Sequence, residues 1–264
     1  MRAERGWLVV LAAAALLSGC EQVYGPTAPS REWQAYDTAR FTLFTRPATF
    51  CESAAASLGE VLEDQYSYAT SALHLSAGPR ISMFLYNSRQ DVTPVLPSDR
   101  SGVAFPETNA VHAVCVAPLD DNLKSLLLHE ANHVVMQNAL GRPGTSFVNE
   151  GLASAVMSER YGLIGPTFLY GWTDRNRSQV PRLADLVDDA KWSSSSDVGY
   201  KSSASFLAFL LDRDGPDPLR QLYYARSADF AARSLEIYGR PLEALEQEWL
   251  AFVGGRDHSS ARVR

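Results

Sequence analysis

The stretch of sequence that decides this fold is His129–His133, which reads His-Glu-Ala-Asn-His. A spacing of four residues puts His129 and His133 on one face of a helix, about one turn apart, so that two imidazole nitrogens can meet a single zinc ion. Glu130 lies beside the first ligand and is free to act as a base, because it need not bind the metal. The spacing therefore predicts a helix that carries two zinc ligands and a catalytic carboxylate.

A third zinc ligand is expected from Glu150, within a segment that reads Phe-Val-Asn-Glu-Gly-Leu-Ala over 147–153. Glu150 is predicted to open a second helix over 150–161, capped by Asn149 or by the residues just before it. A carboxylate on a helix packed across the first gives a His₂Glu set with a fourth position open for water, as in catalytic zinc sites. In the alternative interpretation, the two histidines are core residues and Glu150 is an acid near a helix start. That interpretation needs a separate explanation for each motif.

These motifs resemble those of the gluzincin zinc metallopeptidases, and in particular the bacterial peptidase MA-like families with a Glu-Gly-Leu-Ala third-ligand motif. The segments 199–211 and 238–249 are similar to the helical half of those proteins, so the resemblance covers roughly residues 40 to 253. It implies an α+β, zincin-like fold, with a small mixed sheet and an active-site helix followed by a mainly helical lobe. Asn132 stands where many relatives carry a hydroxylated residue, which leaves the substrate class open.

Apolar periodicity gives the expected organisation of residues 40–253 into an α/β lobe over 40–145 and a helical lobe over 146–253. Strands are predicted at 40–45, 81–86 and 110–116, and a helix at 52–73. Later helices are predicted at 181–187, 199–212, 218–225, 229–238 and 241–253. The loop 191–199, with serines at 193–196, is expected to border the cleft, and 254–264 is expected to be a polar tail.

The strand 110–116 is expected to be the edge strand beside the cleft, since it leads into the zinc helix. In gluzincins such a strand binds extended substrate by main-chain pairing. His112 lies on it, and is either a cleft residue or an ordinary surface or core histidine.

Two further side chains are candidates for the site. Tyr200 stands fifty positions beyond Glu150, at a helix start in the segment that resembles the family, where its phenol is expected to hydrogen-bond the oxyanion of a tetrahedral intermediate. A tyrosine that packs a helix end is the alternative. Ser154, one turn after Glu150, either orients a zinc ligand or is a small residue at a helix contact.

The N-terminal segment 1–20 has the pattern of a secretory signal, with Arg2 and Arg5 before an apolar stretch over 7–17 that is too short to span a membrane. Its end, Leu-Ser-Gly-Cys at 17–20, resembles the bacterial lipobox, which implies a lipid on Cys20. Residue 21 is Glu and not the Asp that often marks retention at the inner membrane, so the outer membrane is favoured. Residues 21–39 are expected to be a tether, and an ordinary signal with an incidental cysteine is the alternative.

Cys51 and Cys115 remain once Cys20 is set aside, an even pair in a compartment that supports disulfides. A disulfide between them would tie the first helix to the strand before the zinc helix. Two buried free thiols are the alternative, and Cys115 is not expected to bind zinc because the His₂Glu set is already complete.

The chain has 264 residues, 46% of them hydrophobic, which is enough for one compact catalytic domain or for two small lobes that share a cleft. Its formal net charge is −6, and Lys and Arg are not clustered. Nucleic acid is not expected as a partner, because phosphate binding needs a basic footprint.

Together these features predict a lipid-anchored zinc peptidase in the bacterial cell envelope that faces the periplasm, with Zn²⁺ as cofactor and a peptide or protein as substrate. Both an endopeptidase and an aminopeptidase fit the sequence. One rival is a non-catalytic lipoprotein that keeps zinc for stability or binds an envelope partner, although a structural site has no use for Glu130 as a base. Another is hydrolysis of a different amide, such as a peptidoglycan stem peptide, by the same chemistry.

Overall fold

The computed structural model describes residues 32–96, 100–161, 165–192 and 197–256. Five strands belong to its sheet: β1 (Gln34–Asp37), β2 (Phe41–Thr45), β3 (Ile81–Tyr86), β4 (Gly102–Phe105) and β5 (Ala110–Val114). The helices are α1 (Phe50–Ser53), α2 (Ala55–Ala72), α3 (Arg89–Val92), α4 (Asp121–Leu140), α5 (Ser146–Ala155), α6 (Pro166–Arg175), α7 (Leu183–Leu186), α8 (Asp197–Asp214), α9 (Pro216–Leu222), α10 (Phe230–Tyr238) and α11 (Leu242–Gly254). The protein is α+β, as expected, and Cys20, the serines at 193–196 and most of the polar tail lie outside the described residues.

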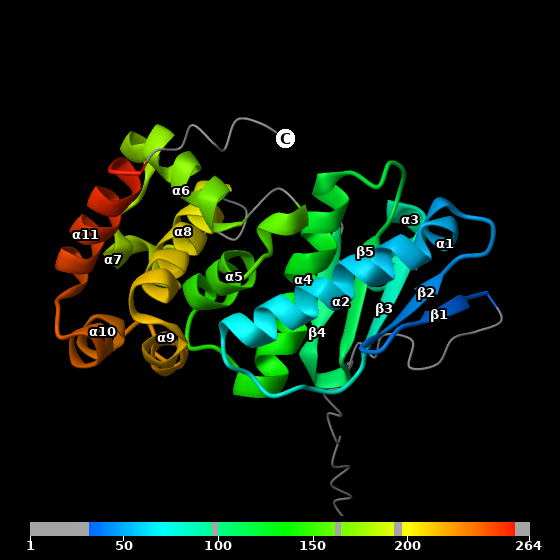
Figure 1. Cartoon of the computed structure of the whole chain (residues 1–264), viewed down its shortest axis with the longest axis horizontal. Helices are drawn as coiled ribbons and strands as arrows, with labels where there is room; N and C mark the ends of the chain where they lie inside the picture. The colour runs from blue at the N-terminus through cyan, green and yellow to red at the C-terminus, as the bar shows by residue number, and fades with distance from the viewer. Residues whose placement is uncertain (1–31, 97–99, 162–164, 193–196, 257–264) are drawn as a thin grey trace, which may run out of the picture.

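The strands form one mixed sheet in the order β1-β2-β3-β5-β4 (Figure 1). The three inner strands are parallel, while β1 and β4 pair antiparallel to their neighbours at the two edges. The prediction of 110–116 as the edge strand is therefore wrong, because β5 lies between β3 and β4. The edge strand next to α4 is β4, a four-residue run too short to show the alternation that marks a strand.

The folded part of the chain also begins earlier than expected. Strand β1 lies within 21–39, which was expected to be a tether, and it pairs with β2 through contacts such as Tyr36 with Leu43. Every residue of β1 is exposed, so its sequence has no buried apolar face to mark it as a strand.

Each face of the sheet carries its own apolar cluster. Helices α2 and α4 cross one face of the sheet (Figure 1). There Leu58 and Leu127 pack in one cluster with strand residues such as Met83. The opposite face is closed by Phe44, Phe84 and their neighbours together with α3. Within the stretch that the structure describes, no helix is both long and apolar enough to cross a membrane.

A separate core fills the helical half, from α5 to α11. Helix α4 belongs to both halves, since Met136 packs into the helical core and Leu128 into the core under the sheet. A helix held from two sides is a rigid support for the side chains it carries.

Two capping residues decide where the site helices begin. Asp120 caps α4, and its carboxylate accepts a hydrogen bond from the Leu123 backbone N–H at 2.9 Å. Thr145 caps α5, so Glu150 lies in the second turn of that helix rather than at its start. The predicted helix over 150–161 is therefore wrong at both ends, because α5 runs over Ser146–Ala155.

The other predicted elements lie within a few residues of the observed ones. The predicted helix 52–73 is divided into α1 and α2, and the predictions for the last five helices correspond to α7, α8, α9, α10 and α11. Helix α6, which begins at Pro166, was not predicted.

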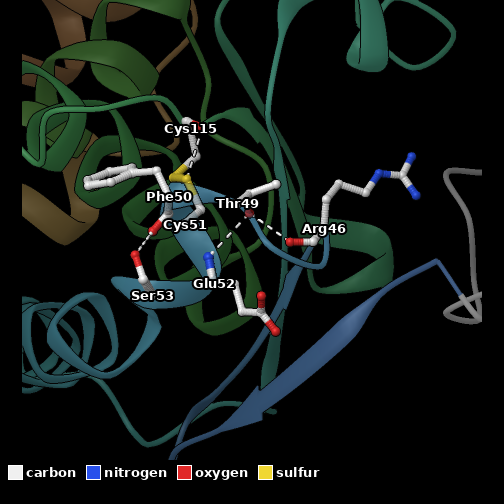
Figure 2. The surroundings of a disulfide bond; sticks show 7 residues. All are labelled: Arg46, Thr49, Phe50, Cys51, Glu52, Ser53 and Cys115. Atoms are coloured by element: carbon white, nitrogen blue, oxygen red, sulfur yellow. Dashed lines mark hydrogen bonds between the residues drawn. A yellow bond between two sulfur atoms is a disulfide. The ribbon is translucent and has the colours of Figure 1, made fainter.

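Cys51 and Cys115 form a disulfide, as expected, with 6.1 Å between their Cα atoms (Figure 2). Cys51 lies on α1, which Thr49 caps by accepting a hydrogen bond from the Glu52 backbone N–H. Cys115 directly follows β5. The bond thus fastens α1 to the segment that connects the sheet with α4.

Removal of this disulfide is expected to lower the free energy of unfolding. The bond closes a loop with a sequence separation of 64 residues, and removing a bridge of this kind costs roughly 2–5 kcal/mol. The double variant Cys51→Ala, Cys115→Ala should unfold at a lower guanidinium concentration than the wild type. Wild-type protein in reductant is the control and should shift similarly; an unchanged midpoint in both would contradict the prediction.

Candidate metal centre

Two imidazoles from α4 and one carboxylate from α5 come together in a compact group. His129 Nε2 lies 3.1 Å from His133 Nε2 and 3.1 Å from Glu150 Oε2. His133 Nε2 lies 3.3 Å from the same carboxylate oxygen. The structure therefore brings together the three residues that the sequence predicts as metal ligands, in an arrangement that can hold a metal ion.

The shape of this triangle fits a tetrahedral ion. Ligands that lie 2.0–2.1 Å from zinc at the corners of a tetrahedron are separated from one another by about 3.3–3.4 Å. The three observed separations, 3.1, 3.1 and 3.3 Å, are close to that value. Among the residues that the structure describes, no fourth histidine, cysteine or acid joins the group, so a fourth corner remains for a small molecule.

Glu150 is held in the charged form that binds a cation. Burial alone would raise the pKa of Glu150, but hydrogen bonds from His129 and His133 outweigh it and hold the pKa well below its ordinary value. The Asn149 side-chain amide donates to the other carboxylate oxygen, Oε1, at 3.1 Å, and Gln137 in turn donates to Asn149 at 3.1 Å. These contacts leave Oε2 directed to the histidines.

Ser154 contacts His129 at the ring nitrogen that does not belong to the triangle. Its Oγ lies 3.0 Å from His129 Nδ1, the ring nitrogen opposite the one in the triangle. A hydrogen bond at this nitrogen fixes the ring orientation of a metal-binding histidine. Of the two interpretations of Ser154, the geometry favours the one in which it orients a ligand. His133 Nδ1 is buried and has no hydrogen-bond partner among the described residues, so that ring is oriented by packing.

Asn132 lies inside the protein, not in the cleft. Its side-chain amide donates to the Ala153 carbonyl at 2.7 Å, and its oxygen accepts from Gln65 at 3.0 Å. Gln65 also donates to the Val156 carbonyl at 2.7 Å. This buried network ties α2, α4 and α5 together and fixes the distance between the two ligand helices. Gly151 lets α5 pack closely on α8, because a Cβ there would lie 2.8 Å from Ser203 on α8.

A cavity of about 550 Å³ opens beside the triangle and is lined by His129, His133 and Glu150 together with Glu130, Tyr200 and strand β4. Glu130 is half-buried there, and burial raises the pKa of its carboxyl to about 7, against the opposing effect of His129. The backbone of Ala104 on β4 hydrogen-bonds the same carboxyl. Glu130 therefore faces the cavity without joining the triangle.

Gly102 allows the edge strand β4 to pass close to α4. A Cβ at this position would lie 3.0 Å from Leu126 and 3.0 Å from Glu130. Neither Gly102 nor Arg100, which also lines the cavity, was predicted from the sequence. The only signal was the apolar run Gly-Val-Ala-Phe over 102–105, which carries no chemistry by itself.

Tyr200 lies on the first turn of α8 and lines the cavity, with its ring centroid 6.4 Å from that of His129. Burial, reinforced by the nearby charge of Glu150, raises the pKa of Tyr200 to about 12. The phenol therefore stays protonated at neutral pH and is able to donate a hydrogen bond. Its ring also packs against Trp192, at 5.7 Å between centroids.

His112 does not belong to the site. It is 1% exposed and stacks on Phe84, on the face of the sheet opposite α4. Burial lowers the pKa of His112 to about 4, and its Nδ1 shares a hydrogen bond with the Tyr86 hydroxyl at 2.9 Å. His112 is thus an ordinary core histidine, the second of the two interpretations.

Neither protein-family models nor curated proteins give a match to this chain. What the site can do is therefore inferred from its own residues and geometry.

Proposed function

We propose that this protein is a zinc-dependent peptidase of gluzincin type with a zincin-like fold. One observation carries the proposal: a His₂Glu triangle of tetrahedral dimensions opens into a cavity that also presents the carboxyl of Glu130. Zinc bound by the triangle would polarise a peptide carbonyl and make water a nucleophile at neutral pH.

Glu130 is the proton carrier in this proposal. Its carboxylate takes a proton from the attacking water as the water oxygen bonds to the carbonyl carbon. The proton then passes to the amide nitrogen as the carbon–nitrogen bond breaks, so that an amine leaves and Glu130 is regenerated. Its raised pKa favours this exchange, because a group that titrates near neutral pH both accepts and donates a proton readily.

Strand β4 provides the surface for the substrate backbone. It is the edge of the sheet, and residues 101–104 line the cavity beside Glu130. An extended peptide added to this edge would be held by main-chain hydrogen bonds, independently of its sequence. In this proposal β4, and not the strand over 110–116, pairs with the main chain of the substrate.

Tyr200→Phe is expected to lower kcat by about 10²-fold to 10³-fold with zinc content unchanged. The phenol donates a hydrogen bond to the oxyanion, and that contact strengthens as negative charge develops. Steady-state kinetics with zinc analysis measures both quantities. Tyr68→Phe, a change at an exposed tyrosine outside the cavity, is the control. Unchanged kinetics in Tyr200→Phe would return Tyr200 to a packing role.

Mass-spectrometric profiling of a peptide mixture incubated with the purified protein tests the proposed activity. New termini should appear in the presence of zinc, disappear with a chelator and return when zinc is restored. The absence of zinc-dependent cleavage would favour the second candidate, a non-catalytic lipoprotein that keeps zinc or binds an envelope partner. The open cavity with an acid beside the triangle argues against that candidate, since structural zinc sites are closed by four protein ligands.

We further propose that the protein is lipid-anchored through Cys20 in the bacterial cell envelope, at the outer membrane facing the periplasm. Support comes from the lipobox-like sequence over 17–20 and from the Cys51–Cys115 disulfide, which fits an oxidising compartment. Cys20→Ser is expected to move the protein from the membrane fraction to the soluble fraction, as measured by fractionation after a salt wash. If the variant stays with the membrane, the anchor lies elsewhere.

A further inference from the structure

Arg100 brings a positive charge into the cavity of the candidate metal centre. It stands two residues before β4 and lines the cavity together with Glu130 and Tyr200. Its backbone carbonyl accepts a hydrogen bond from Arg89, which holds this part of the chain in place. Its guanidinium, in contrast, forms no ion pair or hydrogen bond with any residue that the structure describes.

The charged side chains of the two neighbouring hollows are already engaged, in contrast to the Arg100 guanidinium. Leu126 lines all three hollows, which therefore adjoin one another. In the second, Lys201 is paired with Asp197 at 2.7 Å. The third holds Asp120, whose carboxylate caps α4. Among the described residues that line these hollows, Arg100 is the one Lys or Arg side chain without an ion pair, and its charge acts on Glu130 and Tyr200 across the cavity.

The balance of charge favours an anionic group on the substrate. The two positive charges of a zinc ion would be matched by the carboxylates of Glu130 and Glu150, and Arg100 then leaves an excess of one positive charge. This excess lies in a chain with a net charge of −6, so it is a local feature of the cavity. A guanidinium is the side chain best suited to a carboxylate, because it offers two parallel N–H donors.

The same residues argue against recognition of a free α-amine. An aminopeptidase needs a carboxylate that is available to the substrate ammonium group. Along the described lining of the three hollows, the acids are Glu130, Glu150, Asp120 and Asp197, and each already has a role or a partner.

We propose that Arg100 binds a carboxylate of the substrate, so that the enzyme prefers peptides with an acidic group close to the scissile bond. This inference rests on the proposed peptidase function. Two sources supply the same chemistry: an Asp or Glu side chain, and the C-terminal carboxylate of a short peptide.

Matched peptides separate the two sources. From a cleaved peptide, one series replaces each acidic side chain near the cut by its amide, Glu by Gln or Asp by Asn, and a second replaces the free C-terminal acid by an amide. The wild type should lose about 10- to 100-fold in kcat/KM in one of the two series, as expected for a charge-assisted hydrogen bond. Arg100→Gln should cleave the acid and amide forms at similar rates.

Arg142→Gln is the matched control, since Arg142 is exposed and lies outside the three hollows. It should keep the preference of the wild type. A wild type that does not distinguish acid from amide, or an Arg100→Gln variant that still does, would overturn the assignment.

A binding measurement keeps this test independent of turnover. Zinc-loaded Glu130→Gln protein is immobilised and challenged with an acidic peptide pool and its fully amidated counterpart. The acidic pool should be retained more strongly than the amidated pool. The double variant Glu130→Gln, Arg100→Gln should retain the two pools equally. Acid-selective retention without cleavage by the wild type would reject the peptidase proposal and leave the role of Arg100 standing. Equal retention of both pools, or retention of neither, would reject the role of Arg100.

Discussion

Glu130→Gln is expected to abolish turnover while zinc remains bound. The amide has nearly the same shape as the carboxylate, and its oxygen can keep the hydrogen bond with the backbone of Ala104. It cannot accept the proton of water, however, and loss of a general base costs about 10²-fold to 10⁴-fold in rate. Glu130 lies outside the ligand triangle, so metal content and rate should separate.

The measurement is kcat/KM on a cleaved peptide, together with zinc analysis of the same preparation. Glu60→Gln, at an exposed position on α2, is the matched control and should change neither quantity. Full activity in Glu130→Gln would end the peptidase proposal. Loss of zinc together with activity would instead mean that Glu130 helps to hold the metal.

Glu150→Ala is expected to lose both the metal and the activity. Its Oε2 lies 3.1 and 3.3 Å from the two histidine nitrogens, and no other described acid is placed to substitute for it. Loss of an outer hydrogen-bond partner typically lowers metal affinity by about 10- to 100-fold, and loss of a ligand should exceed that range. Competition with a chromogenic chelator measures the zinc affinity directly.

The exposed residue Glu243 on α11 provides the matched control, because Glu243→Ala removes a carboxylate far from the triangle in sequence and outside the cavity. Its zinc affinity and activity should equal those of the wild type. Circular dichroism of Glu150→Ala should show that the fold is retained. Wild-type zinc affinity in Glu150→Ala would contradict the assignment of the ligand set.

The sequence by itself identified the three residues of the triangle. The positions of His129 and His133 follow from local geometry, since four residues make about one turn of any α-helix. Glu150 was placed by its motif, and the later helices were predicted within a few residues because apolar periodicity and Pro or Gly boundaries are local signals. The even number of cysteines left after Cys20 likewise indicated the Cys51–Cys115 pair.

Only the tertiary structure decided what surrounds the triangle. Strand pairing joins residues far apart in sequence, so the order β3-β5-β4 could not be read from 110–116, and β4 replaced that segment as the edge. Strand β4 and the residues just before it place Gly102, Arg100 and a stretch of backbone beside Glu130. None of these carries a sequence signal of its own. Helix α5 begins at Ser146 and not at Glu150, because Thr145 caps it in place of the predicted Asn149. Ligand spacing is thus local and readable, whereas the shape and charge of the cavity arise from contacts between distant segments.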